Sequence, residues 1–281
     1  MRIDAHQHFW RYDPAEYAWI DEGMSRLRRD FLPDEAKREM AAAGFTACVA
    51  VQVRQTPEET RWLLALADEH PFIVGVVGWV DLQSPDVGAA LGEASRHPKL
   101  VGVRHIVQSE PDDFLRGEAF QRGVALLAGF GLAYDVLVYE RHLPTVIDFV
   151  ARFPAQRFVL DHLGKPEVRN GRIEGWRQNL RRLAALPNVW CKLSGLVTEA
   201  DWSAWTPGQL RPYVDAAAEY FGAARLMIGS DWPVCTLAAT YARAMEPVLE
   251  SIARWSEQDR AAVLGDTARR FWNLAVPEQA P

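Results

Sequence analysis

The sequence has few cysteines and no long apolar run. Its three cysteines, Cys48, Cys191 and Cys235, form no CxxC pair, so we expect free thiols and no disulfide framework. Every apolar run is far shorter than the roughly 18–20 residues that cross a bilayer, and the N-terminus lacks the charged and apolar regions of a signal peptide. The sequence therefore predicts a cytoplasmic protein with no membrane partner.

Positive charge is also scarce. The 281 residues include 31 Lys and Arg against 37 Asp and Glu, which gives a net charge of -6. The densest basic groups are the helical-looking stretch Arg26–Arg29 and the pair Arg181–Arg182. A protein that binds a phosphate backbone needs a basic surface, so we expect no nucleic-acid partner. The 49% of hydrophobic residues is enough for a large core.

Short runs rich in Val, Ile, Leu and Phe alternate with longer amphipathic segments. Such runs are typical of parallel strands that are buried on both faces and joined by crossover helices. Eight of them occur: Arg2–Ala5, Thr46–Val53, Ile73–Trp79, Leu100–Ile106, Leu132–Val138, Arg157–Leu160, Val189–Leu193 and Leu226–Gly229.

The segments between these runs begin at caps or prolines and end near glycines, as helices do. They are Pro33–Ala43, Pro57–Glu69, Pro85–Arg96, Glu118–Phe130, Glu140–Phe153, Gly175–Leu186, Pro207–Phe221 and Leu237–Trp255. Eight strand–helix units over about 250 residues predict a single (β/α)8 TIM barrel that spans residues 1–281. We expect a long loop at Arg11–Phe31, closing helices on the outside of the barrel at Ser256–Leu274 and a frayed end at Pro277–Pro281.

Polar residues gather just past the ends of the predicted strands. The active site of a TIM barrel lies at the C-terminal ends of its strands, so this position selects candidates for function. They are His6, His8, Gln52, Arg54, Trp79, Asp81, Arg104, His105, Asp161, His162, Lys165, Lys192, Ser194, Ser230, Asp231 and Trp232. Imidazoles, cations and carboxylates are thus expected to converge on one mouth.

Strand alternation decides which of these side chains face inward. His6 and His8 are two apart and share a face, whereas the neighbours Arg104 and His105 point to opposite faces, so one of that pair is structural. Lys192 is either a substrate ligand or an ion-pair partner inside the barrel. We expect Asp161 to be a structural partner.

Several candidates also have simpler explanations. Asp231 could cap the helix that follows it, and His162 could be a buried core histidine. Trp10, Trp79 and Trp232 follow strand ends, where an indole can stack on the apolar face of a sugar ring, which favours a small polyhydroxylated substrate. The same tryptophans could instead pack under loops.

Five stretches occur in the order of the strand ends: IDAHQHFW, VGVRH, LDHLGKP, VWCKLSGL and IGSDWP. Together they resemble the amidohydrolase superfamily, within it the amidohydrolase-2 branch and its sugar lactonases. The resemblance implies hydrolysis of a sugar lactone such as L-fucono- or L-rhamnonolactone, with Asp231 as the general base on water. His6, His8 and His162 would polarise the carbonyl. Substrate contacts are expected from Arg104, Trp10, Gln52, Trp79, Lys192 and Trp232.

The family pattern for metals is only partly present. Metal-dependent relatives add a lysine after strand four and a histidine after strand five, where this chain has Arg104, His105 and Asp135. We therefore expect no binuclear site. A single ion such as Zn²⁺ on His6, His8, His162 and Asp231 stays open, but lactonases of this branch work without metal, so we expect no required cofactor. The alternatives are a mononuclear zinc-dependent amide hydrolase or decarboxylase and a non-catalytic sugar-binding barrel.

Overall fold

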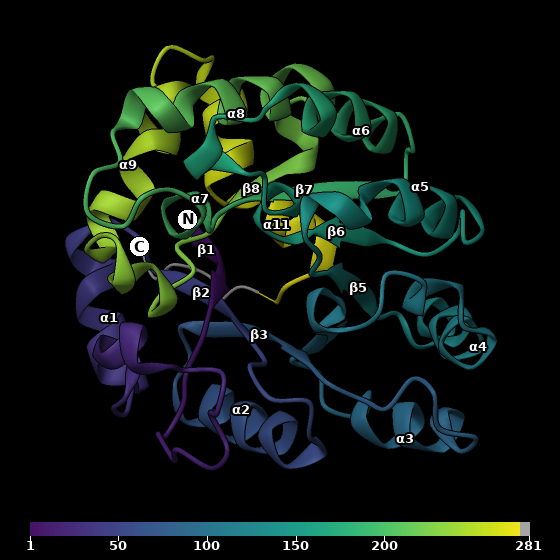
Figure 1. Ribbon diagram of the computed structural model, residues 1–281. Coiled ribbons are helices and arrows are strands. Elements are labelled where there is room, and N and C mark those ends of the chain that lie inside the picture. Colours follow the sequence, from purple (N-terminus) through teal and green to yellow (C-terminus); the bar gives the residue numbers. More distant parts are fainter. Residues whose placement is uncertain (276–281) are drawn as a thin grey trace.

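Eight parallel strands form one sheet in chain order, which confirms the TIM barrel (Figure 1). The computed structural model describes residues 1–275. The strands are β1 (Ile3–Gln7), β2 (Ala47–Val51), β3 (Ile73–Gly78), β4 (Leu100–His105), β5 (Ala133–Val136), β6 (Phe158–Leu160), β7 (Val189–Leu193) and β8 (Leu226–Ile228). Each overlaps the run that predicted it, and all three cysteines are free and buried.

The first and last strands meet at the C-terminal rim of the barrel. The amide of His8 donates to the carbonyl of Trp232 at 2.7 Å, and the amide of Asp231 donates to the carbonyl of His6 at 2.9 Å. These bonds place His6, in β1, and His8, just after it, directly beside the carboxylate that follows β8.

The helices alternate with the strands as expected, and most of them lie around the barrel (Figure 1). They are α1 (Pro33–Ala42), α2 (Pro57–Glu69), α3 (Val87–Ala94), α4 (Glu118–Leu127), α5 (Leu143–Ala151), α6 (Glu174–Ala184), α7 (Leu196–Glu199), α8 (Pro207–Phe221), α9 (Tyr241–Ile252), α10 (Glu257–Ala261) and α11 (Thr267–Trp272). The predicted helix Leu237–Trp255 starts later, because Thr240 accepts a hydrogen bond from the amide of Arg243 and caps α9 there. No helix within residues 1–275 is long and apolar enough to cross a membrane.

The end of the chain corrects one expectation. We expected the segment Ser256–Leu274 on the outside of the barrel, but α11 lies across the central axis (Figure 1). Its Phe271 and Trp272 pack in one buried cluster with strand residues such as Ile3, Val49 and Met227. The apolar strand residues of this cluster would otherwise be exposed to solvent, and α11 covers them. The predicted frayed end Pro277–Pro281 lies outside the described residues.

The loop after β1 is held at both ends. Trp10 and Phe31 exchange backbone hydrogen bonds of 3.0 and 2.9 Å. Within the loop, Glu16 forms an ion pair with Arg54, and the Arg54 guanidinium lies 5.5 Å from the ring centroid of Tyr17. The expected long loop is therefore an ordered wall beside the end of β2.

Replacing Trp272 by Ala should lower the free energy of unfolding by about 3–5 kcal/mol, because it empties a large buried volume under the barrel. The indole is 3% exposed, and its centroid lies 5.2 Å from the Lys192 ammonium. Trp202, which is 36% exposed, is the matched control. Trp202→Ala should cost less than about 1 kcal/mol. Chemical denaturation measures both variants, and equal losses would contradict the assigned role of α11.

Candidate active site

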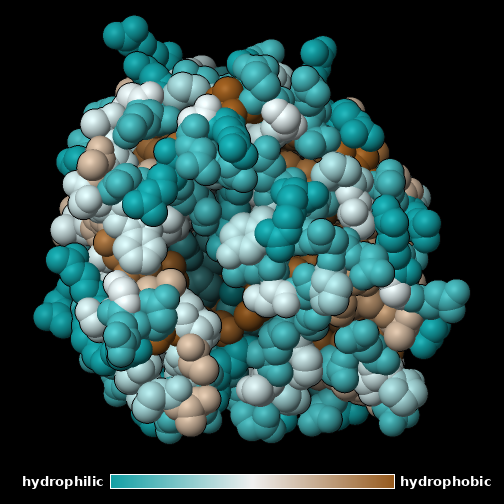
Figure 2. Space-filling model, in the orientation of Figure 1, coloured by the Kyte–Doolittle hydropathy of each residue, from teal (hydrophilic) through white to brown (hydrophobic). Residues whose placement is uncertain are grey.

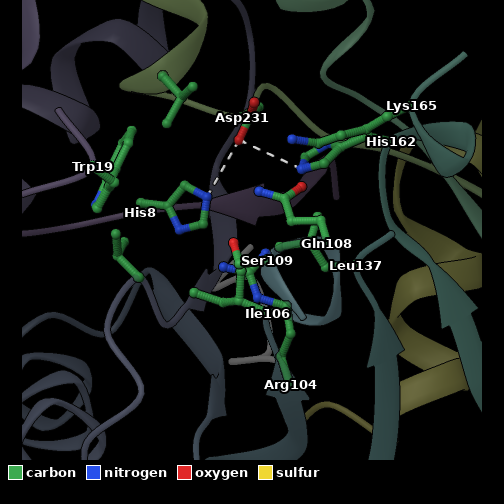
Figure 3. Close-up of a pocket in the computed structure, with 12 residues that line it drawn as sticks. His8, Trp19, Arg104, Ile106, Gln108, Ser109, Leu137, His162, Lys165 and Asp231 are labelled. Atoms are coloured by element: carbon green, nitrogen blue, oxygen red, sulfur yellow. Dashed lines mark ion pairs between the residues drawn. The ribbon is translucent and has the colours of Figure 1, made fainter. Parts of the chain in front are cut away.

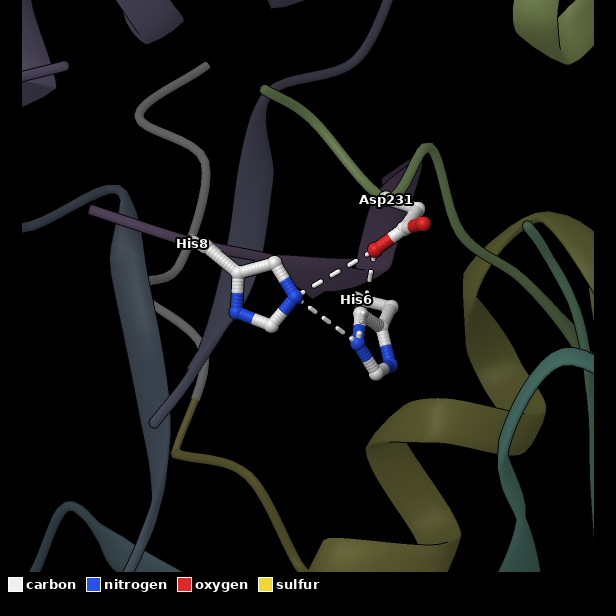
Figure 4. Close-up of side chains that lie close together, drawn as sticks. All are labelled: His6, His8 and Asp231. Carbon is white, nitrogen blue, oxygen red and sulfur yellow. Dashed lines mark hydrogen bonds and ion pairs between the residues drawn. The ribbon is translucent and has the colours of Figure 1, made fainter. Parts of the chain in front are cut away.

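Four side chains meet at the C-terminal mouth: His6 in β1, His8 just after it, His162 after β6 and Asp231 after β8. We call them the quartet. The Asp231 Oδ1 atom lies 3.3 Å from His8 Nε2 and 3.8 Å from the Nε2 atoms of both His6 and His162. The Nε2 atoms of His6 and His8 are 3.2 Å apart. Figures 3 and 4 show the imidazole edges turned toward the carboxylate. The structure thus brings the four predicted residues together.

Unusual backbone conformations aim these side chains. Between Asp4 and Gln7 the register of β1 against β2 gains one residue, a bulge of the kind that redirects side chains near active sites. His162 and Asp231 adopt left-handed backbone angles, with φ of 53° and 59°. Such residues persist only where their surroundings hold them, and they concentrate at functional sites.

The hydrogen bond of His8 to the Val51 carbonyl determines which ring nitrogen carries the proton. His8 Nδ1 lies 2.7 Å from the carbonyl oxygen of Val51, which only accepts, so Nδ1 carries a proton. In a neutral ring the Nε2 atom then has a lone pair, and it faces the Asp231 carboxylate, which is also an acceptor. That contact is attractive only when His8 holds a second proton or a cation lies between the two groups.

Burial and charge set the protonation of the other members. Burial lowers the pKa of His162 to about 4, so this ring is neutral near pH 7. Burial alone raises the pKa of Asp231, but the facing imidazoles of His162, His8 and His6 outweigh it and hold that pKa below its ordinary value. Asp231 is therefore ionised and can accept a proton.

A buried ionic layer supports the quartet from below. Lys192 contacts Asp135 at 2.5 Å and Asp161 at 2.9 Å, and Arg104 Nη1 donates to Asp161 at 3.1 Å. Arg104 also donates to the carbonyl of Gln52. Asp161 is the structural partner that we expected, and Lys192 is an ion-pair partner inside the barrel.

The quartet opens into a cavity of about 190 Å³ (Figures 2 and 3). This is below the roughly 300–1,000 Å³ of pockets for drug-sized ligands and suits a smaller molecule. Its wall has an apolar part and a polar part around the predicted residues His8, Arg104, His162 and Asp231. The remaining lining residues are Trp19, Val53, Ile106, Leu137 and Val234 on the apolar part and Gln108, Ser109 and Lys165 on the polar part.

The alternation of side chains along β4 correctly predicted that Arg104 and His105 point to opposite faces. The Arg104 guanidinium reaches the cavity, whereas His105 points away, contacts Glu110 at 2.8 Å and stacks on Phe114. Gln52 and Lys192, expected to bind substrate, are fully buried and lie beneath the cavity without lining it.

The three tryptophans expected to stack on a sugar do not line the cavity either. Trp10 lies under the loop after β1 and donates to the carbonyl of Arg29. Trp232 packs against Phe9 and Phe31, and Trp79 lies in a crevice between α2 and α3. Bulky side chains beside strand ends here fill the space under loops.

Sequence reasoning missed part of the cavity wall. Trp19, which is 42% exposed, stands on the loop 11–31, whose path the sequence did not reveal. Gln108 and Ser109 lie in a short helical turn after β4. Lys165 was among the candidates, because it ends the LDHLGK stretch after β6, and it lines the cavity with a left-handed φ of 50°.

A family model described as Amidohydrolase matches residues 3–274. This protein belongs to the amidohydrolase family. It is 46% identical to an L-fucono-1,5-lactonase of Burkholderia multivorans, over 100% of this chain and 98% of the relative. It is 40% identical to an L-fucono-1,5-lactonase of Burkholderia ambifaria, over 99% and 97%. A crystal structure of a Burkholderia multivorans amidohydrolase with bound zinc is 46% identical and superposes with a TM-score of 0.95, over 98% of this chain and 100% of that one.

The amidohydrolase places Gly195 where a side chain would strike His162. A Cβ atom there would lie 2.5 Å from His162 Nδ1, whereas one at Gly171 would meet nothing within 4 Å. Both glycines have left-handed φ angles, 67° and 64°, so either alanine costs about 1–2 kcal/mol. Gly195→Ala should cost a further 1–3 kcal/mol or so from overpacking and displace the His162 imidazole NMR signals. If both variants lose equal stability and leave those signals in place, His162 is not held by this contact.

Proposed function

We propose that this amidohydrolase opens the ring of a sugar lactone by hydrolysis, with an aldonolactone of the L-fucono-1,5-lactone class as its substrate. The observation that carries the proposal is an ionised Asp231 that faces three imidazoles at the floor of a small cavity. The names of the two Burkholderia relatives support the substrate class. Lactones are activated esters, so attack by water needs less assistance than for an amide.

Asp231 acts as the base. It removes one proton from a water molecule as the oxygen attacks the lactone carbonyl carbon, and the new C–O bond gives a tetrahedral oxyanion. When the bond from that carbon to the ring oxygen breaks, Asp231 returns the proton to the departing ring oxygen. The single product is the aldonic acid, in which the former ring oxygen is a free hydroxyl.

His162 and Arg104 stabilise the oxyanion, and so does His8 when its Nε2 atom holds a second proton. All three line the cavity around Asp231, and each donor of this kind contributes roughly 2.7–4 kcal/mol in the transition state. His6 is fully buried behind them. We therefore assign His6 a supporting position behind His8 and Arg104.

The cavity wall suits a deoxy sugar. The hydroxyl groups of the lactone can bond to Gln108, Ser109 and Lys165, while the C6 methyl of a 6-deoxy compound fits the apolar wall that includes Trp19. An indole face is also a good platform for the C–H side of a sugar ring.

A zinc-dependent amidohydrolase is the second candidate, because the spacing of His6, His8 and Asp231 suits a divalent ion. Tetrahedral zinc with bonds of roughly 2.0–2.1 Å places its ligand atoms about 3.3 Å apart, and the contacts among these three residues are 3.2–3.8 Å. His6, His8 and Asp231 would hold the ion, whereas His162 lies outside this group of ligand atoms. When bound, it would supply a Lewis acid for the carbonyl. We propose that the hydrolysis does not require it.

Asp231→Asn should lower kcat by roughly 10²–10⁴-fold, because it removes the proton acceptor and keeps the size of the side chain. Turnover is measured on a panel of 1,4- and 1,5-aldonolactones, among which L-fucono-1,5-lactone should react fastest in the wild type. Asp81→Asn, at an exposed position after β3, serves as the control and should be unaffected. Similar rates for Asp231→Asn and wild type, or no hydrolysis of any lactone by the wild type, would disprove the proposal.

Exhaustive chelation should leave most of the lactonase activity. The protein side chains already supply a base and three hydrogen-bond donors, so the reaction does not depend on a Lewis acid. The rate is compared before chelation, after it and after addition of Zn²⁺. Complete loss on chelation with recovery on Zn²⁺ would favour the second candidate.

A further inference from the structure

Two cationic side chains, Arg104 and Lys165, line the cavity, and each already has a carboxylate partner. Arg104 Nη1 lies 3.1 Å from Asp161 Oδ2. Lys165 Nζ lies 3.6 Å from Oε1 of Glu199, the last residue of α7, and only 17% and 20% of these two side chains are exposed. Both cations of the cavity wall, as residues 1–275 describe it, are therefore balanced by a negative charge.

The Lys165 side chain is held in place by the segments around it. Its amide donates to the carbonyl of His162 at 2.8 Å. Its ammonium nitrogen lies 5.4 Å from the ring centroid of Tyr139, an attractive contact for a cation. Figure 3 shows Lys165 beside His162 at the cavity. The segments that follow β5, β6 and β7 thus meet at one ammonium group next to the proposed reaction centre.

The proposed reaction converts a neutral substrate into an anion. A lactone has no charge, whereas the carboxyl group of an aldonic acid titrates near roughly pH 4 and loses its proton to solvent at pH 7. The new carboxylate forms at the former carbonyl carbon, beside the ionised Asp231, and the two like charges repel each other. An unpaired ammonium group in the cavity wall would offset that repulsion and retain the product.

We infer that Glu199 is a positioning residue that keeps the Lys165 ammonium group paired, so that the cavity binds a neutral lactone and releases the anionic aldonate. The inference rests on the proposed lactone hydrolysis, because the anion is the product of that reaction. Lys165 can still donate a hydrogen bond to a lactone hydroxyl, since an ammonium group has three donors and Glu199 engages one of them. Glu199 therefore acts on the ligand through Lys165.

The first test removes the partner charge and keeps the size of the side chain. Glu199→Gln should lower the dissociation constant for L-fuconate, the ring-opened product of L-fucono-1,5-lactone, by about fivefold or more, because Lys165 can then attract the carboxylate. The KM for the neutral lactone should change by less than about twofold, since the ligand has no net charge. Calorimetric titration measures fuconate binding, and steady-state kinetics measures the KM.

Glu58→Gln is the matched control. Glu58 pairs with Arg61 at 2.6 Å on the exposed face of α2, so this variant also removes one carboxylate from an ion pair, but far from the mouth. Both constants should stay at their wild-type values.

The second test asks whether the gain in affinity requires the ammonium group. The double variant Lys165→Met, Glu199→Gln lacks both charges, so its dissociation constant for fuconate should lie within about twofold of the wild-type value. A merely structural effect of Glu199→Gln would persist in the double variant.

Three results would overturn the inference: unchanged or weaker fuconate binding in Glu199→Gln, no fuconate binding to any variant, or a gain that persists without Lys165. Because fuconate binding is measured without turnover, these results are distinct from a failure of the proposed function, in which the wild type hydrolyses no lactone.

Discussion

The seam between the first and last strands is the contact on which the site depends. The buried carboxylate of Asp4 accepts hydrogen bonds from the amides of His6 and Ser230, from the Ser230 hydroxyl and from the Tyr241 hydroxyl, at 3.1, 2.9, 2.5 and 3.0 Å. One side chain therefore joins β1, the end of β8 and helix α9. Since His6 and His8 continue β1 and Asp231 follows Ser230, this carboxylate sets the distance between the imidazoles and the proposed base.

Below the seam, the barrel interior has a layer of charged side chains and, beneath it, an apolar part. Apolar side chains fill the lower part and α11 covers them, while Arg104, Asp135, Asp161 and Lys192 form an ionic layer above. Buried ion pairs are weak contributors to stability because desolvation offsets their attraction. Here they also orient the site, because Lys192 contacts Nδ1 of His6 and Arg104 contacts its Nε2, while the Arg104 guanidinium reaches the cavity.

Strand periodicity made the barrel and its rim predictable from the sequence, whereas the loops were not. Apolar runs located all eight strands, and the rule that parallel strands end at one rim brought His6, His8, His162 and Asp231 together. Periodicity carries no information on the path of residues 11–31, so Trp19 was not identified. Trp10 and Trp232, which were expected to contact substrate, are buried and do not line the cavity. Residues after the last strand have no strand partner, and their sequence alone did not distinguish the bottom of the barrel from its outside.

The residues proposed to catalyse the reaction stand at strand ends, whereas residues proposed to select the substrate stand on loops. The quartet rests on strand ends that are fixed by the seam and the ionic layer, whereas Trp19, Gln108 and Ser109 stand on the segments that follow β1 and β4. The ion pair of Arg54 with Glu16 fastens the loop after β1 to the end of β2 without contacting the quartet. A change in that loop can therefore reshape the apolar wall while Asp231 keeps its imidazole partners, because within residues 1–275 no hydrogen bond of the quartet to the barrel passes through residues 11–31.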